Sequence, residues 1–204
     1  MQAYMKSAMP YHGVQTPLLD RTCKQLFRDL EWDDARAWQE HVLELWRNAT
    51  HREERYAAIH LTGRRAAAAF QTPAAMPLYE EIIVTGAWWD YVDVIASRRV
   101  GPILQKYPAP MKKLMLRWSQ SGNLWKRRTS IICQLGFKKD TDLDLLYACI
   151  EPSIDSNEFF LRKAIGWALR QYAWTDPAEV KRYVRRNEAR LSGLSKREAL
   201  KNIG

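Results

Sequence analysis

Four segments of the sequence can be aligned: ERYAAIHL (54–61), WDYVDVIA (89–96), WKRRTSII (125–132) and FLRKAIGW (160–167). Their first residues are 35, 36 and 35 positions apart. Each segment ends on an apolar residue seven positions after its first, as the spacing of a helix face requires. A helical unit that recurs with this period is typical of a solenoid, because a single helix pair cannot bury its apolar face alone. The sequence therefore predicts an all-α protein made of stacked antiparallel helix pairs.

Helix-length segments fill the rest of the chain in the same way. Breaks such as Thr72-Pro73, Ser121-Gly122 and Asp176-Pro177 separate them. No Gly- or Ser-rich linker divides the sequence, so residues 1–204 are expected to form one HEAT-like domain with a concave basic groove. The predicted helices are 18–30, 35–49, 53–70, 75–86, 89–106, 109–120, 124–136, 142–151, 157–173, 177–191 and 195–203.

The composition indicates a partner that carries phosphates. The 32 Lys and Arg exceed the 23 Asp and Glu, which gives a formal charge of +9, and nine Trp residues accompany them. Such a surface suits phosphates and flat rings. The three scattered cysteines indicate neither a disulfide framework nor a zinc site, and are expected to be buried free thiols. The start of the chain has no apolar leader segment, and no apolar run is long enough to span a bilayer. The sequence therefore predicts a cytoplasmic, nucleoid-associated protein that does not bind a membrane.

One residue departs from the repeat pattern. Asp93 stands four positions after its segment start, where the other three segments carry Ala58, Thr129 and Ala164. A carboxylate among close-packed helices costs stability unless it is paired or functional. Trp89 precedes Asp93 by four residues, so both side chains share one helix face.

Cations and a second indole follow in the next segments. Arg128 and Lys163 lie one position before the register of Asp93, and Trp167 and Arg170 continue the stripe of Lys163. A fixed carboxylate among indoles and cations suits cleavage of a glycosidic bond through an oxocarbenium-like state. A nucleophilic triad is not evident, and no His lies near Asp93, so neither a metal nor a cofactor is expected.

Three longer stretches resemble the AlkD-type DNA alkylation repair glycosylases. They are EEIIVTGAWWDYVDVI (80–95), WSQSGNLWKRRTSI (118–131) and NEFFLRKAIGWALRQYA (157–173). Weaker similarity at residues 4–6, 13–17 and 194–203 extends the resemblance over nearly the whole chain. It implies a HEAT-like glycosylase that excises cationic N3- and N7-alkylpurines from duplex DNA without flipping the base into a tight pocket. Compared with that family, the capping helices at both ends of this chain are expected to be shortened.

The resemblance also implies a role for each matching residue. Asp93 would be the catalytic carboxylate, and Trp89, Trp167 and, on a weaker match, Tyr4 would line the lesion site. The residues that would hold the DNA backbone are Arg128, Lys163 and Arg170. The protein would act as a monomer. Structural roles are expected for Trp88, Trp118 and Trp125, which would pack in the core, for Asp90, which would cap a helix, and for the basic run 181–186, which would be a solvated helix face.

Two other readings of the sequence remain open. The first is a non-catalytic HEAT-repeat protein that binds bent or branched DNA. The second is a protein-binding HEAT adaptor, for which the positive charge would require an acidic partner.

Overall fold

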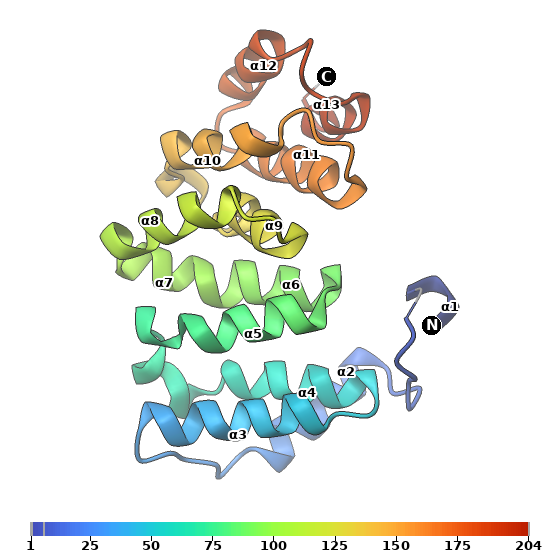
Figure 1. The fold of residues 1–204 in the computed structure, drawn as a ribbon, viewed down its shortest axis with the longest axis vertical. Helices are drawn as coiled ribbons and strands as arrows, with labels where there is room; N and C mark the ends of the chain where they lie inside the picture. Colours follow the sequence, from blue (N-terminus) through green and yellow to red (C-terminus); the bar gives the residue numbers. More distant parts are fainter. Residues whose placement is uncertain (1, 6, 204) are drawn as a thin grey trace. The chain divides into compact units, whose positions relative to one another are not determined.

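A computed structural model describes residues 2–5 and 7–203, and every regular element in these ranges is helical (Figure 1). The prediction of an all-α protein is therefore confirmed. The chain divides into two compact units, Met1–Ile82 and Ile83–Gly204. The single domain expected over residues 1–204 stays a prediction. None of the described helices is long and apolar enough to cross a membrane.

The first unit is built around α3 and α4, which pack on each other. Its core holds Trp38, whose ring stacks on Phe70 at 5.9 Å between centroids and meets Tyr79 edge-on at 6.5 Å. The helices that begin in this unit are α1 (Gln2–Met5), α2 (Thr16–Leu26), α3 (Ala35–Asn48), α4 (Arg52–Thr62) and α5 (Met76–Gly86), with short 3₁₀ turns at Arg65–Phe70 and Pro73–Ala75.

The second unit is a stack in which each helix pair packs on the next (Figure 1). Helix α9 touches α6 on one side and α11 on the other, and α11 in turn packs closely on α13. The helices of this unit are α6 (Trp89–Ile95), α7 (Gly101–Lys106), α8 (Pro108–Ser119), α9 (Leu124–Ile132), α10 (Leu143–Ile150), α11 (Phe159–Ala173), α12 (Pro177–Arg186) and α13 (Gly193–Leu200).

Side-chain caps fix where several of these helices begin. Asn123 accepts hydrogen bonds from the backbone nitrogens of Trp125 and Lys126 at 2.9 and 3.1 Å, which starts α9. Asp176 and Ser192 cap α12 and α13 in the same way. These residues satisfy amide groups that have no partner inside the helix. Asp176 is part of the Asp176-Pro177 break that the sequence predicts, and Asn123 follows the predicted break at Ser121-Gly122.

Two predicted helices differ from the structure in their interior. Residues 53–70 do not form one helix, because α4 ends at Thr62 with Gly63 as its C-cap and a 3₁₀ segment, Arg65–Phe70, follows. Glycine weakens a helix, which explains the break. Residues 89–106 are continuous, but Ala96–Val100 forms a π-helical turn between α6 and α7. Pro102 has no amide hydrogen to donate, which interrupts the regular backbone hydrogen bonding of the helix at this point.

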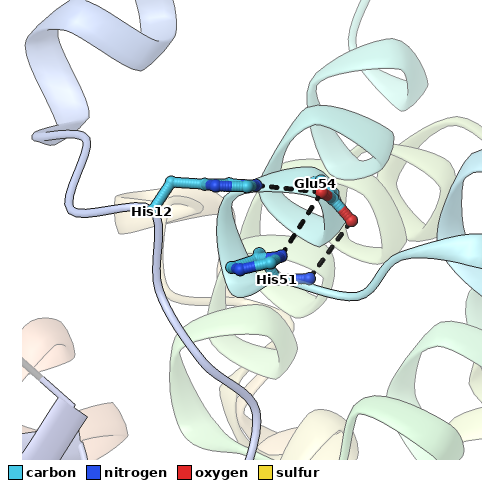
Figure 2. A group of neighbouring side chains, drawn as sticks. All are labelled: His12, His51 and Glu54. Atoms are coloured by element: carbon cyan, nitrogen blue, oxygen red, sulfur yellow. Dashed lines mark hydrogen bonds and ion pairs between the residues drawn. The ribbon is translucent and has the colours of Figure 1, made fainter.

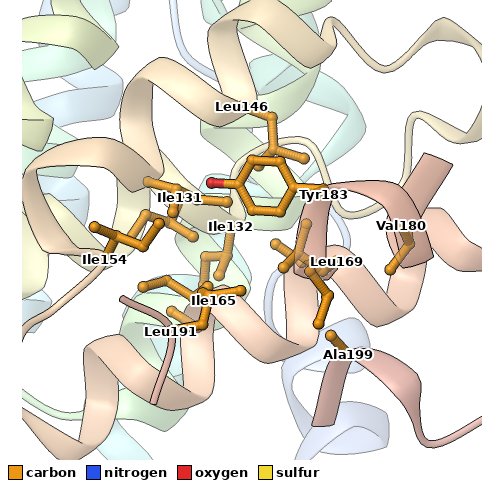
Figure 3. Packing of buried hydrophobic residues seen from close by; sticks show 14 of the residues in the cluster. Ile131, Ile132, Leu146, Ile154, Ile165, Leu169, Val180, Tyr183, Leu191 and Ala199 are labelled. Carbon is orange, nitrogen blue, oxygen red and sulfur yellow. The ribbon is translucent and has the colours of Figure 1, made fainter. Parts of the chain in front are cut away.

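An apolar cluster joins α9 to α13 (Figure 3). Ile131 and Ile132 of α9, Ile165 and Leu169 of α11, and Val180 of α12 meet in it, and all five are buried. The three cysteines are free and buried, as the sequence predicts. Burial raises the pKa of the Cys149 thiol to about 12, so this thiol stays protonated at neutral pH.

Helices α11 and α13 approach each other closely at Gly166. A Cβ atom there would lie 2.5 Å from the Cβ of Glu198 and 2.9 Å from the carbonyl oxygen of Ser195. Because a backbone atom cannot move aside as a flexible side chain does, a larger residue would push the two helices apart. The glycine therefore fixes the position of α11 against α13.

We expect Gly166→Ala to lower the free energy of unfolding by about 1–3 kcal/mol, the usual cost of overfilling a packed contact. Chemical denaturation followed by circular dichroism measures this loss. Gly122→Ala is the matched control, since a Cβ there would meet nothing within 4 Å. Equal stabilities of the two variants would show that α11 and α13 can separate without cost.

Candidate functional site

Helix α6 presents Asp93 together with an indole. The helix begins after Trp88, and Asp90 in its first turn accepts a hydrogen bond from the amide of Tyr91 at 3.0 Å. Trp89 and Asp93 follow one turn apart, so they lie on the same face of α6. Trp89 is half-buried, and the side chain of Asp93 is 13% exposed. The Asp93 carboxylate, on the same helix face as an indole, is thus partly accessible to solvent.

Arg128 of α9 holds both oxygens of Asp93. Its Nε donates to Oδ1 at 2.7 Å, and its Nη2 donates to Oδ2 at 2.8 Å. A third donor, Nη1, reaches the carbonyl oxygen of Phe160 in α11 at 2.6 Å. Arg128 thereby joins three consecutive layers of the stack, and its side chain is only 5% exposed. A bidentate pair of this kind fixes the plane of the carboxylate.

An aromatic cluster lies next to the guanidinium through Phe160. Trp88, Trp125 and Phe160 contact one another with centroid distances of 4.9 to 6.2 Å. The guanidinium carbon of Arg128 lies 5.9 Å from the Phe160 ring centroid. Trp125 is buried, in agreement with its predicted packing role. These rings restrict the rotamer of Arg128, and with it the position of the Asp93 carboxylate.

Two opposing influences act on the ionisation of Asp93. Burial raises the pKa of its carboxyl above the ordinary value, and the Arg128 guanidinium counteracts part of that rise. The nearby Asp90 carboxylate adds a smaller raising influence. Arg128 is therefore the group that favours the charged form of Asp93.

Lys163 and Arg170 of α11 share one carboxylate. Lys163 Nζ lies 2.8 Å from Oε1 of Glu198, and Arg170 Nη1 lies 2.6 Å from Oε2 of the same residue in α13. The hydrogen bond from Lys163 is the main influence that lowers the pKa of the Glu198 carboxyl. Trp167 lies between the two cations on α11 and is half-buried against the core cluster. The two cations thus keep part of their exposure with their charge partly balanced.

The structure brings some of the predicted residues together directly and others only through a third residue. Asp93 and Arg128 are in contact, and Lys163 and Arg170 meet through Glu198. Tyr4 lies in α1, in the first unit, and is 80% exposed. Sequence reasoning missed Glu198 and the Phe160 carbonyl. Glu198 belongs to the 194–203 stretch, and it follows Lys163 by 35 residues, the spacing of one repeat.

This geometry can be set beside known proteins. The sequence profile of the family described as DNA alkylation repair enzyme matches residues 1–203. The chain belongs to this DNA alkylation repair enzyme family. No curated protein matches the chain. A solved structure described as a predicted DNA alkylation repair enzyme from Enterococcus faecalis is 30% identical, with a TM-score of 0.81, and the match covers 100% of this chain and 93% of that one.

Membership in the DNA alkylation repair enzyme family supports a role in DNA repair and makes DNA the expected substrate. Within that family role, the second unit contributes a fixed carboxylate, half-buried indoles and partly exposed cations. This set can hold a phosphate backbone and present a negative charge to a cationic ring.

Proposed function

We propose that the protein is a DNA glycosylase that hydrolyses the N-glycosidic bond of positively charged N3- and N7-alkylpurines in duplex DNA. The observation that carries the proposal is the Asp93 carboxylate, which Arg128 holds in one plane on the helix face of Trp89 and which stays 13% exposed. Trp167 is proposed to line the lesion site with Trp89, and the role of Tyr4 stays a prediction from the sequence. The enzyme acts as a monomer, and the reaction requires water alone as co-reactant.

In the proposed reaction the bond between C1′ and the alkylated purine breaks first. Both bonding electrons go to the purine, which loses its positive charge and leaves as a neutral base. The sugar becomes oxocarbenium-like, and the fixed charge of Asp93 stabilises it and orients the attacking water. Water adds to C1′ and its proton passes to solvent, so that a free base and an abasic site are formed. Because the lesion carries its own positive charge, the leaving group needs no acid.

Arg128 has two functions in this proposal. A guanidinium has five N–H donors, and three of them hold Asp93 and the Phe160 carbonyl. The remaining two N–H groups can donate to a DNA phosphate beside the lesion without release of the carboxylate. Lys163 and Arg170 hold further phosphates along a basic groove, where the phosphate charge competes with Glu198.

The test of this proposal is base release. Methylated duplex DNA is incubated with the protein, and the soluble fraction is analysed for 7-methylguanine and 3-methyladenine. We expect both bases in excess of spontaneous depurination, and unmethylated duplex should give neither. Release at the spontaneous rate would reject the glycosylase.

DNA affinity should depend steeply on salt, since binding releases counterions from phosphates. We expect log K to fall linearly with log salt, and Lys163→Ala to reduce the slope by about one. Fluorescence anisotropy with a labelled duplex between low and moderate salt measures both. Glu198→Gln is the complementary variant, because it removes the balancing carboxylate and should tighten binding. A flat salt dependence would instead favour a protein-binding adaptor.

One observation favours a second candidate, a non-catalytic DNA-binding protein. Asp93, Lys163 and Arg170 all have protein partners of opposite charge, as residues of purely structural networks do. Such a protein would bind the methylated duplex with the same salt dependence and release no base. The release assay therefore separates the two candidates.

A further inference from the structure

We propose that His12, His51 and Glu54, in the first unit, form a binding site for a zinc ion. Each residue offers one ligand atom, and these atoms all lie within 4.8 Å of one another. His12 comes from the segment before α2, whereas His51 and Glu54 flank the start of α4 (Figure 2). Two imidazoles and one carboxylate are a ligand set that zinc accepts, with a fourth position left for water.

The distances from Glu54 to the two imidazole nitrogens are close to those between neighbouring ligand atoms in a zinc site. His12 Nε2 lies 2.9 Å from Glu54 Oε1, and His51 Nδ1 lies 3.6 Å from the same oxygen. Bond lengths near 2 Å in a tetrahedral site place neighbouring ligand atoms about 3.3 Å apart. The two imidazole rings are stacked at 3.7 Å between centroids. Nitrogen lone pairs lie in the ring plane, so the partly exposed His12 ring must turn when the ion binds.

Backbone groups orient Glu54 for this role. Its Oε2 accepts hydrogen bonds from the amides of Thr50 and His51 at 2.5 and 3.1 Å, which leaves Oε1 directed at the two imidazoles. The hydrogen bond from His12 and those from Thr50 lower the pKa of Glu54 to about 2, so the carboxylate is charged at neutral pH. Hydrogen bonds to the oxygen that does not bind the ion hold a carboxylate ligand in place and so strengthen a metal site.

A separate contact holds His12 in place. The buried carboxylate of Glu53 accepts hydrogen bonds from the amides of His12, Gly13 and Val14 at 2.9 to 3.0 Å. The amide of Arg52 also donates to the carbonyl of Pro10 at 3.0 Å. The backbone of this segment is thus bound to α4 independently of the imidazole. Zinc would strengthen this attachment of the segment that follows Tyr4.

The experiment is a calorimetric titration of Zn²⁺ into the chain without a histidine tag. We expect one ion per chain, and a dissociation constant at least about tenfold weaker in His12→Ala and in His51→Ala. His41→Ala is the matched control and should bind as the wild type does, since His41 lies in α3 and pairs with Trp32. His12→Ala keeps the backbone contacts to Glu53, so its fold is preserved.

A second readout locates the ion. Zinc should raise the midpoint of thermal unfolding of the wild type and of His41→Ala, because a ligand that binds the folded state stabilises it. The same addition should leave His12→Ala unchanged. The proposal is overturned by the lack of stoichiometric zinc uptake in the wild type, or by equal zinc affinity in wild type and His12→Ala. Neither result bears on base release.

Discussion

Asp93→Asn is expected to lower the rate of base release by about 100- to 1,000-fold, the size of effect that follows loss of one fixed electrostatic group in an active site. The amide keeps the shape of the carboxylate but carries no charge to oppose the developing positive charge on the sugar. DNA affinity should stay within about twofold of the wild type, because binding depends on the cations that hold phosphates. Single-turnover release and anisotropy on the same duplex measure the two quantities.

Asp90→Asn is the matched control for this variant. Asp90 lies on the same helix one turn earlier in the chain and serves the amide of Tyr91, a contact that the asparagine oxygen can also make. We expect it to retain release within a few-fold of the wild type. Release by Asp93→Asn at the wild-type rate, or equal losses in the two variants, would contradict a specific role for Asp93.

Arg128→Met is expected to lower the free energy of unfolding by about 3–5 kcal/mol at neutral pH. The change leaves the buried Asp93 carboxylate unpaired, and removal of one partner of a buried ion pair has a cost of this order. It also removes the donor to the Phe160 carbonyl. Denaturant unfolding of the variant and the wild type measures the difference.

The pH dependence of that loss identifies its cause. Without Arg128 only burial and Asp90 act on Asp93, and both raise its pKa. The unpaired carboxylate then destabilises the folded state above the unfolded-state pKa, and this penalty disappears as pH falls and the group is protonated. The double variant Arg128→Met with Asp93→Asn should recover much of the stability at neutral pH. A deficit that is the same at acid and neutral pH would show that lost packing, and not charge, is responsible.

Much of the fold could be predicted from the chain because its signals are local. The helices predicted to begin at residues 124 and 177 do begin there, after the breaks at Ser121-Gly122 and Asp176-Pro177. The π-helical turn at Ala96–Val100 could not be predicted, since it depends on how α6 and α7 continue around Pro102 within the stack. The helix predicted over residues 75–86 forms as α5, Met76–Gly86.

The candidate site was predictable only in part. The repeat register singles out Asp93 and places Trp89 on the same face, but it says nothing of which cation would pair with which acid. In the structure Arg128 pairs with Asp93 and Lys163 pairs with Glu198, and each pair is separated by 35 residues. A search for opposite charges one repeat apart would have found both pairs.

The group of His12, His51 and Glu54 shows a limit of spacing rules. The two histidines are far apart in sequence and fit no metal-binding motif, so the sequence predicts no metal site there. The contact depends on Glu53, which binds the backbone at residues 12–14 and brings His12 to the start of α4. Tertiary hydrogen bonds of this kind leave no periodic signal.

The most direct measurement for the central claim is to identify both products from one duplex that carries a single 7-methylguanine. Our account predicts that free 7-methylguanine and abasic sites appear in equal amounts, over many turnovers per protein molecule, and that Asp93→Asn forms both about 100- to 1,000-fold more slowly. A methyl group lost while the guanine stays attached to the sugar would contradict the account, as would equal product formation by Asp93→Asn.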